Sequence, residues 1–181
     1  MHKILFLTNM EQTAAYLQDA LKLAQQTQDA VAGQVLYVPS DTEWTRDMEK
    51  QLQQAEVVIF PWMGTGLSNK FLSEPSSYLL ANKKKHVYLM TGNPEDILHG
   101  GLAEEELKRI NDYYKFGGLQ NWTNLWLWLA QQFLQAACNA PAPELLPWDG
   151  IYHPQAAKVY HDVEEYRRDF CKAGRPTLAV V

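Results

Sequence analysis

The stretch VVIF at residues 57–60, closed by Pro61, is an uninterrupted apolar run typical of a strand buried on both faces of a parallel sheet. Working outward from it, runs of the same character occur at residues 3–8, 34–38 and 86–90. Stretches with helical apolar spacing separate these runs, at residues 11–28, from 41 or 42 to about 55, and at 71–82. Strands that alternate with helices predict an α/β fold with a small doubly wound parallel sheet, Rossmann-like or flavodoxin-like, followed by a helical segment.

From residue 102 the pattern changes to successive helices, expected at residues 102–116, 119–139 and 157–172. The predicted organisation is an α/β domain at 1–101, a helical extension packed on it at 102–174, and the start of a following domain at 175–181. The last of these rests on Arg175-Pro176 and an apolar stretch at 177–181 that reads as a strand. We therefore expect the chain to be a fragment cut at the opening of that following domain.

The expected helix at 119–139 carries two apolar stripes, whereas a surface helix carries one. The first stripe is Trp122, Leu125, Trp126, Leu129 and Phe133, and the second is Leu127, Trp128 and Leu134. Either the helix is enclosed on two sides or one stripe meets a partner outside this chain. These aromatic side chains could bind a planar ligand, but core packing is the favoured interpretation.

Composition narrows the classes of partner. The 181 residues contain 16 Lys plus Arg against 21 Asp plus Glu, for a net charge of −5. This charge disfavours a nucleic acid or an anionic membrane surface as partner. The two cysteines are too few for a disulfide framework, and no stretch is apolar enough for a membrane span, so a cytoplasmic protein is expected.

The first strand-to-helix turn, at residues 8–13, lacks the glycines of a dinucleotide site and places Glu11 where a phosphate would sit. Thr8, Asn9 and Thr13 weakly resemble a flavodoxin-like phosphate loop, but helix capping is the favoured role for them. The loop from Gly64 to Lys70 also fails the spacing of a Walker A motif. We expect neither a bound flavin nor tight binding of ATP.

In a doubly wound sheet, ligands bind beyond the carboxyl ends of the strands. Two predicted loops lie at that edge, one containing Gly64 and Thr65 and the other containing Gly92 and Asn93. These four residues are therefore candidates for the rim of a binding site, although their glycines also fit simple turns.

The five histidines show no spacing typical of a zinc site, and neither cysteine has a nearby histidine, so no metal site and no nucleophile is predicted. His153 stands in the turn Gly150-Ile-Tyr-His-Pro154, where it could either be functional or order the turn through a backbone hydrogen bond.

Three stretches together resemble the N-terminal region of the cobaltochelatase large subunit (CobN) and its relative, the H subunit of magnesium chelatase. The first is Tyr113-Tyr114 before Phe116-Gly117-Gly118, with Asn121 and a helix rich in Leu and Trp. The others are the turn at 150–154 and the segment Arg-Pro-Thr-Leu-Ala-Val-Val at 175–181. Their order and spacing agree with the family over most of the chain.

The resemblance implies a chain several times longer that holds a tetrapyrrole and inserts a divalent metal into it, together with AAA+ partner subunits that hydrolyse ATP. In the cobalt branch the ring is hydrogenobyrinic acid a,c-diamide, and in the magnesium branch it is protoporphyrin. No catalytic residue carries over, since the family's insertion chemistry is thought to lie outside this stretch. Tyr152 and His153 carry over as candidate substrate-binding residues. The alternative is a free-standing flavodoxin-like module for a small ligand or for interaction.

Overall fold

The sheet has five strands in the order β2-β1-β3-β4-β5. They are β1 (Lys3–Thr8), β2 (Gly33–Tyr37), β3 (Ala55–Trp62), β4 (Lys85–Met90) and β5 (His99–Gly100). The first four strands pair in parallel, and β5 pairs antiparallel with β4. The chain moves outward from β1 to β2 and then returns past β1 to β3 and β4, which is a doubly wound arrangement. The predicted fold class, a small α/β fold of Rossmann-like or flavodoxin-like type, is confirmed.

The computed structural model describes residues 3–39, 42–63, 70–90, 99–145, 149–153, 156 and 159–171. It forms two compact units, Met1–Glu144 and Leu145–Val181. The sequence-based division, with breaks after residues 101 and 174, follows the change in element pattern and stays a prediction. The expected strand at 177–181 lies outside the described residues.

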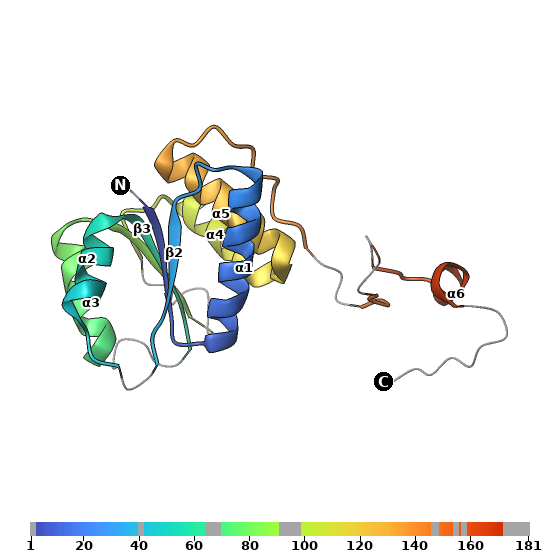
Figure 1. Cartoon of the computed structure of the whole chain (residues 1–181), viewed down its shortest axis with the longest axis horizontal. Coiled ribbons are helices and arrows are strands. Elements are labelled where there is room, and N and C mark those ends of the chain that lie inside the picture. The colour runs from blue at the N-terminus through green and yellow to red at the C-terminus, as the bar shows by residue number, and fades with distance from the viewer. Residues whose placement is uncertain are drawn as a thin grey trace. The chain divides into compact units, whose positions relative to one another are not determined.

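Helices of the first unit cover both faces of the sheet (Figure 1). One face carries α2 (Arg46–Gln54) and α3 (Lys70–Ala81), and the other carries α1 (Glu11–Thr27), α4 (Glu104–Phe116) and α5 (Gly118–Leu134). Each face has its own apolar core, because successive side chains of a strand point to opposite faces.

Trp126 lies at the centre of the core beneath α1, α4 and α5, with no exposed surface. Its ring centroid is 4.5 Å from that of Phe6 on β1, and its Nε1–H donates to the carbonyl of Leu17 on α1 at 3.0 Å. A Cβ at Gly33 would lie 2.3 Å from Trp126 Cζ3, so β2 accommodates the indole through the absence of a side chain. Helix α5 is therefore enclosed on two sides, and its aromatic residues serve core packing.

The second core lies beneath α2 and α3. Phe60 on β3 stacks on Tyr88 on β4 with ring centroids 4.4 Å apart and planes inclined by 10°. Leu52 of α2 and Leu79 of α3 are fully buried against this face. A stacked aromatic pair on neighbouring strands contributes about 0.5–1.5 kcal/mol beyond the burial of its area.

Several element boundaries differ from those expected. Helix α2 begins at Arg46 with Thr45 as its N-cap, because the Thr45 side chain accepts a hydrogen bond from the N–H of Met48 at 3.3 Å. Helix α5 ends at Leu134, five residues early, because Gln135 takes a left-handed conformation with φ 57°. The short strand β5 was not predicted, since two residues carry no detectable periodicity.

The described residues of the second unit form a small hairpin-like bridge and one helix. Ile151 and Tyr160 exchange two backbone hydrogen bonds, of 2.7 and 3.0 Å. Helix α6 (Val163–Phe170) begins after Asp162, whose side chain accepts from the N–H of Glu164. The expected helix at 157–172 is thus shorter at its start, because Tyr160 pairs with Ile151 instead of entering a helix.

Candidate functional site

The carboxyl ends of β1 and β3 are joined by the side chain of Asn9. Its Nδ2–H donates to the carbonyl of Met63, and its Oδ1 accepts from the N–H of Met63, both at 2.9 Å. The two hydrogen bonds pair an amide side chain with a backbone segment 54 residues away. This bridge ties the end of β3 to the residue after β1 at the carboxyl edge of the sheet, which is the edge where open α/β sheets in general bind ligands.

The polar side chains of the first turn make hydrogen bonds within the fold, but none of them caps helix α1. The Oγ1 of buried Thr8 accepts from the N–H of Met10 at 3.1 Å, and Met10 itself is the N-cap of α1 without a side-chain hydrogen bond. Thr13 contacts the sulfur of Met10 at 3.9 Å. The favoured capping role for Thr8, Asn9 and Thr13 is therefore wrong, because Thr8 closes a turn and Asn9 bridges two strands.

The predicted rim residues Gly64, Thr65, Gly92 and Asn93 lie outside the described residues. Their assignment to a binding site remains a prediction.

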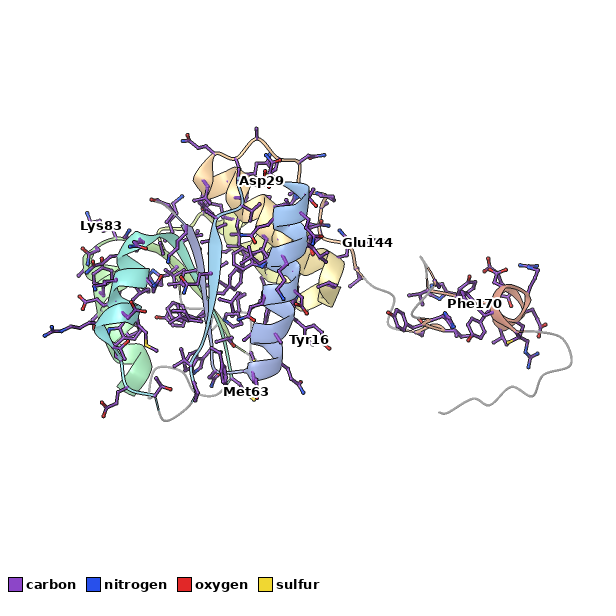
Figure 2. All side chains as sticks on the ribbon, in the orientation of Figure 1. Tyr16, Asp29, Met63, Lys83, Glu144 and Phe170 are labelled. Carbon is purple, nitrogen blue, oxygen red and sulfur yellow. The ribbon has the colours of Figure 1, made fainter. Side chains whose placement is uncertain are left out.

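The described part of the same edge presents two apolar side chains to solvent. Tyr37 at the end of β2 is 42% exposed, and Met63 just beyond β3 is 58% exposed. Figure 2 shows Met63 at the end of the sheet opposite Lys83.

The turn containing Tyr152 and His153 is built on aromatic contacts in the second unit. The His153 ring stacks on Phe170 of α6, with centroids 3.9 Å apart and planes inclined by 26°. Its backbone carbonyl accepts from the N–H of Ala156 at 2.9 Å. Tyr160 packs edge-on against Phe170 and donates its hydroxyl to Asp169 Oδ2 at 2.8 Å.

Tyr152 differs from His153 in being 73% exposed. The His153 ring packs on α6 through Phe170, whereas its part in substrate binding stays a prediction. Gly150 permits the turn, since its φ is 143° and a Cβ would lie 2.4 Å from Val159 Cγ1 and 2.9 Å from the carbonyl of Tyr160. Within the second unit, Tyr152 is thus the member of this candidate pair that is free to meet a ligand or a partner.

Sequence reasoning missed the structural role of Asn121. This residue is 3% exposed on α5, and its Nδ2 donates to the carbonyls of Gly117 and Glu144 at 2.8 and 2.7 Å. Its Oδ1 accepts from the N–H of Glu144 at 2.9 Å. A polar residue at a core position of an apolar helix is the signal that could have indicated it, because a buried amide needs partners.

Two further findings concern metals and membranes. Among the described residues, no cluster of three or more His, Cys, Asp or Glu side chains could hold a metal ion. Across the same part of the chain, no helix has the length and apolarity needed to cross a membrane.

The fold and its strand-end edge define a small α/β domain of the Rossmann or flavodoxin type. A family model described as CobN/Magnesium Chelatase matches residues 111–181. The aerobic cobaltochelatase subunit CobN of Pseudomonas aeruginosa is 33% identical over 89 residues, which are 49% of this chain and 7% of that protein. The catalytic subunit of cobaltochelatase from Mycobacterium tuberculosis superposes with a TM-score of 0.58 at 14% identity, over 87% of this chain and 12% of that one.

The resemblance seen in the sequence is therefore confirmed, because residues 111–181 match the CobN/Magnesium Chelatase family model and a cobaltochelatase subunit is similar over about half of the chain. The solved structure supports the fold alone, because its identity is low. The chain spans a small fraction of the length of both relatives.

Proposed function

We propose that this chain is the α/β domain of a CobN-type chelatase large subunit, which takes part in ATP-dependent insertion of cobalt into a corrin precursor, hydrogenobyrinic acid a,c-diamide, in cobalamin biosynthesis. The observation that carries the proposal is the agreement between the family match over residues 111–181 and the cobaltochelatase relative at 33% identity. The cobalt branch is favoured over the magnesium branch because both named relatives are cobaltochelatase subunits.

In this proposal the chain binds no cofactor of its own and carries out no metal insertion alone. ATP, Mg²⁺ and cobalt belong to the complete system, in which the partners are the rest of the large subunit and AAA+ subunits. Cobalt and the tetrapyrrole are substrates. The reaction takes place in the cytoplasm.

The contribution of this chain is to shape one wall of the tetrapyrrole cavity. The Asn9–Met63 bridge ties the carboxyl ends of β1 and β3 together, and Tyr37 and Met63 supply exposed apolar surface at the same edge. The predicted rim of Gly64, Thr65, Gly92 and Asn93 continues that wall. Tyr152 and His153, in the second unit, stay candidate substrate-binding residues in their own right, and Tyr152 is exposed. We expect weak affinity for the ring, because most of the cavity wall would come from other parts of the large subunit.

The test is a titration of the 181-residue chain with hydrogenobyrinic acid a,c-diamide, protoporphyrin and FMN. Binding is monitored through tryptophan fluorescence and amide chemical shifts. Hydrogenobyrinic acid a,c-diamide should bind more tightly than protoporphyrin and should perturb Asn9, Tyr37 and Met63. A preference for protoporphyrin would favour the magnesium branch. Tight binding of FMN, or ring-induced shifts confined to the opposite edge of the sheet, would overturn the proposal in favour of a flavodoxin-like module.

A second measurement tests whether this chain binds or hydrolyses MgATP. No phosphate-binding glycine loop follows β1, so the chain alone should neither bind MgATP tightly nor hydrolyse it. Calorimetry that gave micromolar affinity for MgATP would contradict the assignment of ATP hydrolysis to separate subunits.

A further inference from the structure

Strand β2 forms one edge of the sheet, because the strand order is β2-β1-β3-β4-β5. Two backbone hydrogen bonds at its ends show which of its groups face β1. The N–H of Ile4 donates to the carbonyl of Ala32, and the N–H of Val38 donates to the carbonyl of Thr8, both at 2.9 Å. The even-numbered residues of this stretch therefore direct their backbone groups toward β1.

The backbone groups of the remaining residues of β2 point away from the sheet. Because the direction alternates along a strand, Gln34 and Leu36 face β1, whereas the N–H and carbonyl groups of Gly33, Val35 and Tyr37 face outward. Within the part of the chain that the structure describes, none of these outward groups makes a hydrogen bond. Strand β2 is thus an open edge of five residues to which another strand can be added.

This edge lacks the charged side chains with which natural edge strands commonly block such pairing. Between Asp29 and Asp41 the sequence contains no Asp, Glu, Lys or Arg. At the other edge of the sheet, β5 (His99–Gly100) has two residues, which is too short for extensive pairing. An added strand would therefore meet no charged side chain of β2.

Both faces of β2 are already covered, so a further strand can be added only along its edge. Figure 1 shows α1 on one side of β2 and α2 on the other. Val35 is 8% exposed and belongs to the core beneath α1, and Leu36 packs against the core beneath α2. Tyr37 differs from both, because it is 42% exposed at the end of the strand.

We propose that β2 pairs antiparallel with β2 of a second copy of this chain, about a two-fold axis at Val35. The outward-facing residues are spaced evenly around Val35, so the two edges are self-complementary. Val35 then lies opposite Val35 of the second copy, and Gly33 lies opposite Tyr37. Each opposed pair exchanges two backbone hydrogen bonds, so every outward N–H and carbonyl of β2 gains a partner.

The pairing of Gly33 with Tyr37 adds a side-chain contact and favours a second copy over an unrelated strand. Directly opposed residues of an antiparallel pair project their side chains to the same face of the sheet. Since Gly33 has no side chain, the exposed ring of Tyr37 from one copy can lie over the Gly33 backbone of the other. An aromatic residue beside an edge glycine stabilises a sheet in this way. The two-fold axis provides this contact at both ends of the paired strands.

The experiment measures the mass of the 181-residue chain by sedimentation equilibrium from about 5 µM to about 500 µM. A short paired edge gives a weak dimer, so the mass should rise from 20.7 kDa toward twice that value. A chain that stays monomeric would overturn the proposal and leave the edge to a strand of another protein. Assemblies larger than a dimer would contradict the closed two-fold arrangement. Tyr37 is shared with the proposed cavity wall, but no tetrapyrrole is present here, so the two proposals can fail separately.

Amide hydrogen exchange, followed by NMR, tests which residues pair. The amides of Gly33, Val35 and Tyr37 should exchange several-fold more slowly at high than at low concentration. Those of Gln34 and Leu36, which already face β1, are internal controls and should change little with concentration. A dimer that left the three outward amides unprotected would be formed through another surface, and the proposal would be wrong.

Variants at Tyr37 complete the test without altering the core. Tyr37→Pro removes an outward N–H that β1 does not use and should weaken the dimer at least about tenfold. Tyr37→Asp keeps every backbone group, adds a carboxylate at the edge and should also weaken it. Tyr16→Asp, at a tyrosine of α1 that is 59% exposed, is the matched control and should dimerise like the unmodified chain. Circular dichroism checks that each variant is folded. Undiminished dimerisation of both Tyr37 variants would overturn the proposal.

Discussion

The side chain of Asn121 makes two hydrogen bonds with the backbone of Glu144. It accepts from the Glu144 N–H at 2.9 Å and donates to the Glu144 carbonyl at 2.7 Å. Glu144 is the last residue of the first compact unit. Asn121 thus anchors the connector on α5 at the point where the chain leaves that unit. A buried amide with all these partners is expensive to remove, because the backbone groups left behind lose hydrogen bonds.

Asn121→Ala should lower the free energy of unfolding by about 1–3 kcal/mol, the cost of leaving buried polar groups unsatisfied. Chemical denaturation measures this change, and limited proteolysis should show faster cleavage near residue 144. Gln131→Ala is the control, since Gln131 is an exposed residue of the same helix. Unchanged stability of Asn121→Ala would mean that the connector is not held by this amide.

Asn9→Ala should speed hydrogen exchange of the Met63 amide and lower stability by about 0.5–1.5 kcal/mol, the net contribution of a typical hydrogen bond. Asn9→Asp should be no better, because one carboxylate oxygen would face the carbonyl of Met63 where the amide now donates. Gln12→Ala, at an exposed position of α1, is the matched control. The bridge would be dispensable if exchange at Met63 were the same in all three variants.

Gly33→Ala should destabilise the chain by about 1–3 kcal/mol through overpacking, because the new methyl would lie 2.3 Å from Trp126 Cζ3. Trp126→Phe should also destabilise, since it removes ring volume and the hydrogen bond to Leu17. The double variant should be more stable than the sum of the two effects predicts, as the smaller ring makes room for the methyl. Strict additivity in denaturation experiments would show that the two residues are not coupled.

Gly150→Ala should disrupt the Ile151–Tyr160 bridge, since the added Cβ would approach Val159 Cγ1 and the carbonyl of Tyr160. The measurement is the ring-current shift that Phe170 imposes on His153, whose rings are 3.9 Å apart. This shift should collapse toward the value of an unstructured histidine. Tyr152→Ala, at an exposed neighbour, should preserve it. If both variants kept the shift, α6 would not depend on the bridge.

Alkaline pH should destabilise the chain through Tyr114. Burial raises the pKa of Tyr114 above its ordinary value of 10.0, in a side chain that stacks on Trp122 with parallel rings 5.8 Å apart. Because the folded pKa is the higher one, this stabilisation is present below pH 10 and is lost as the pH rises through the folded pKa. Tyr114→Phe should reduce the loss of stability above pH 10 in denaturation experiments. Tyr16→Phe, at a side chain 59% exposed, is the control, and an equal effect of both variants would contradict this account.

The sequence by itself determined the α/β fold class, the four parallel strands and most of the helices. Continuous apolar runs such as residues 57–60 and helical spacing in residues 11–28 are local signals, and each reflects which faces must be buried. The resemblance at Tyr113-Tyr114, Asn121 and the turn at 150–154 also predicts the match to the chelatase family model. It predicted Tyr152 and His153 as substrate-binding residues. It could not show that Tyr152 is exposed whereas the His153 ring stacks on Phe170.

Only the tertiary structure decided which polar side chains hold the edges and the connector. Asn9 meets Met63 across 54 residues and Asn121 meets Glu144 across 23, and neither pairing leaves a periodic trace in the sequence. A pocket lined by Leu79, His86 and Gly100 also depends on tertiary structure. Helix α3, the turn before β4, and β5 come together there only after the sheet forms. Local periodicity reports burial along one element, whereas a site depends on contacts between elements that long-range packing brings together.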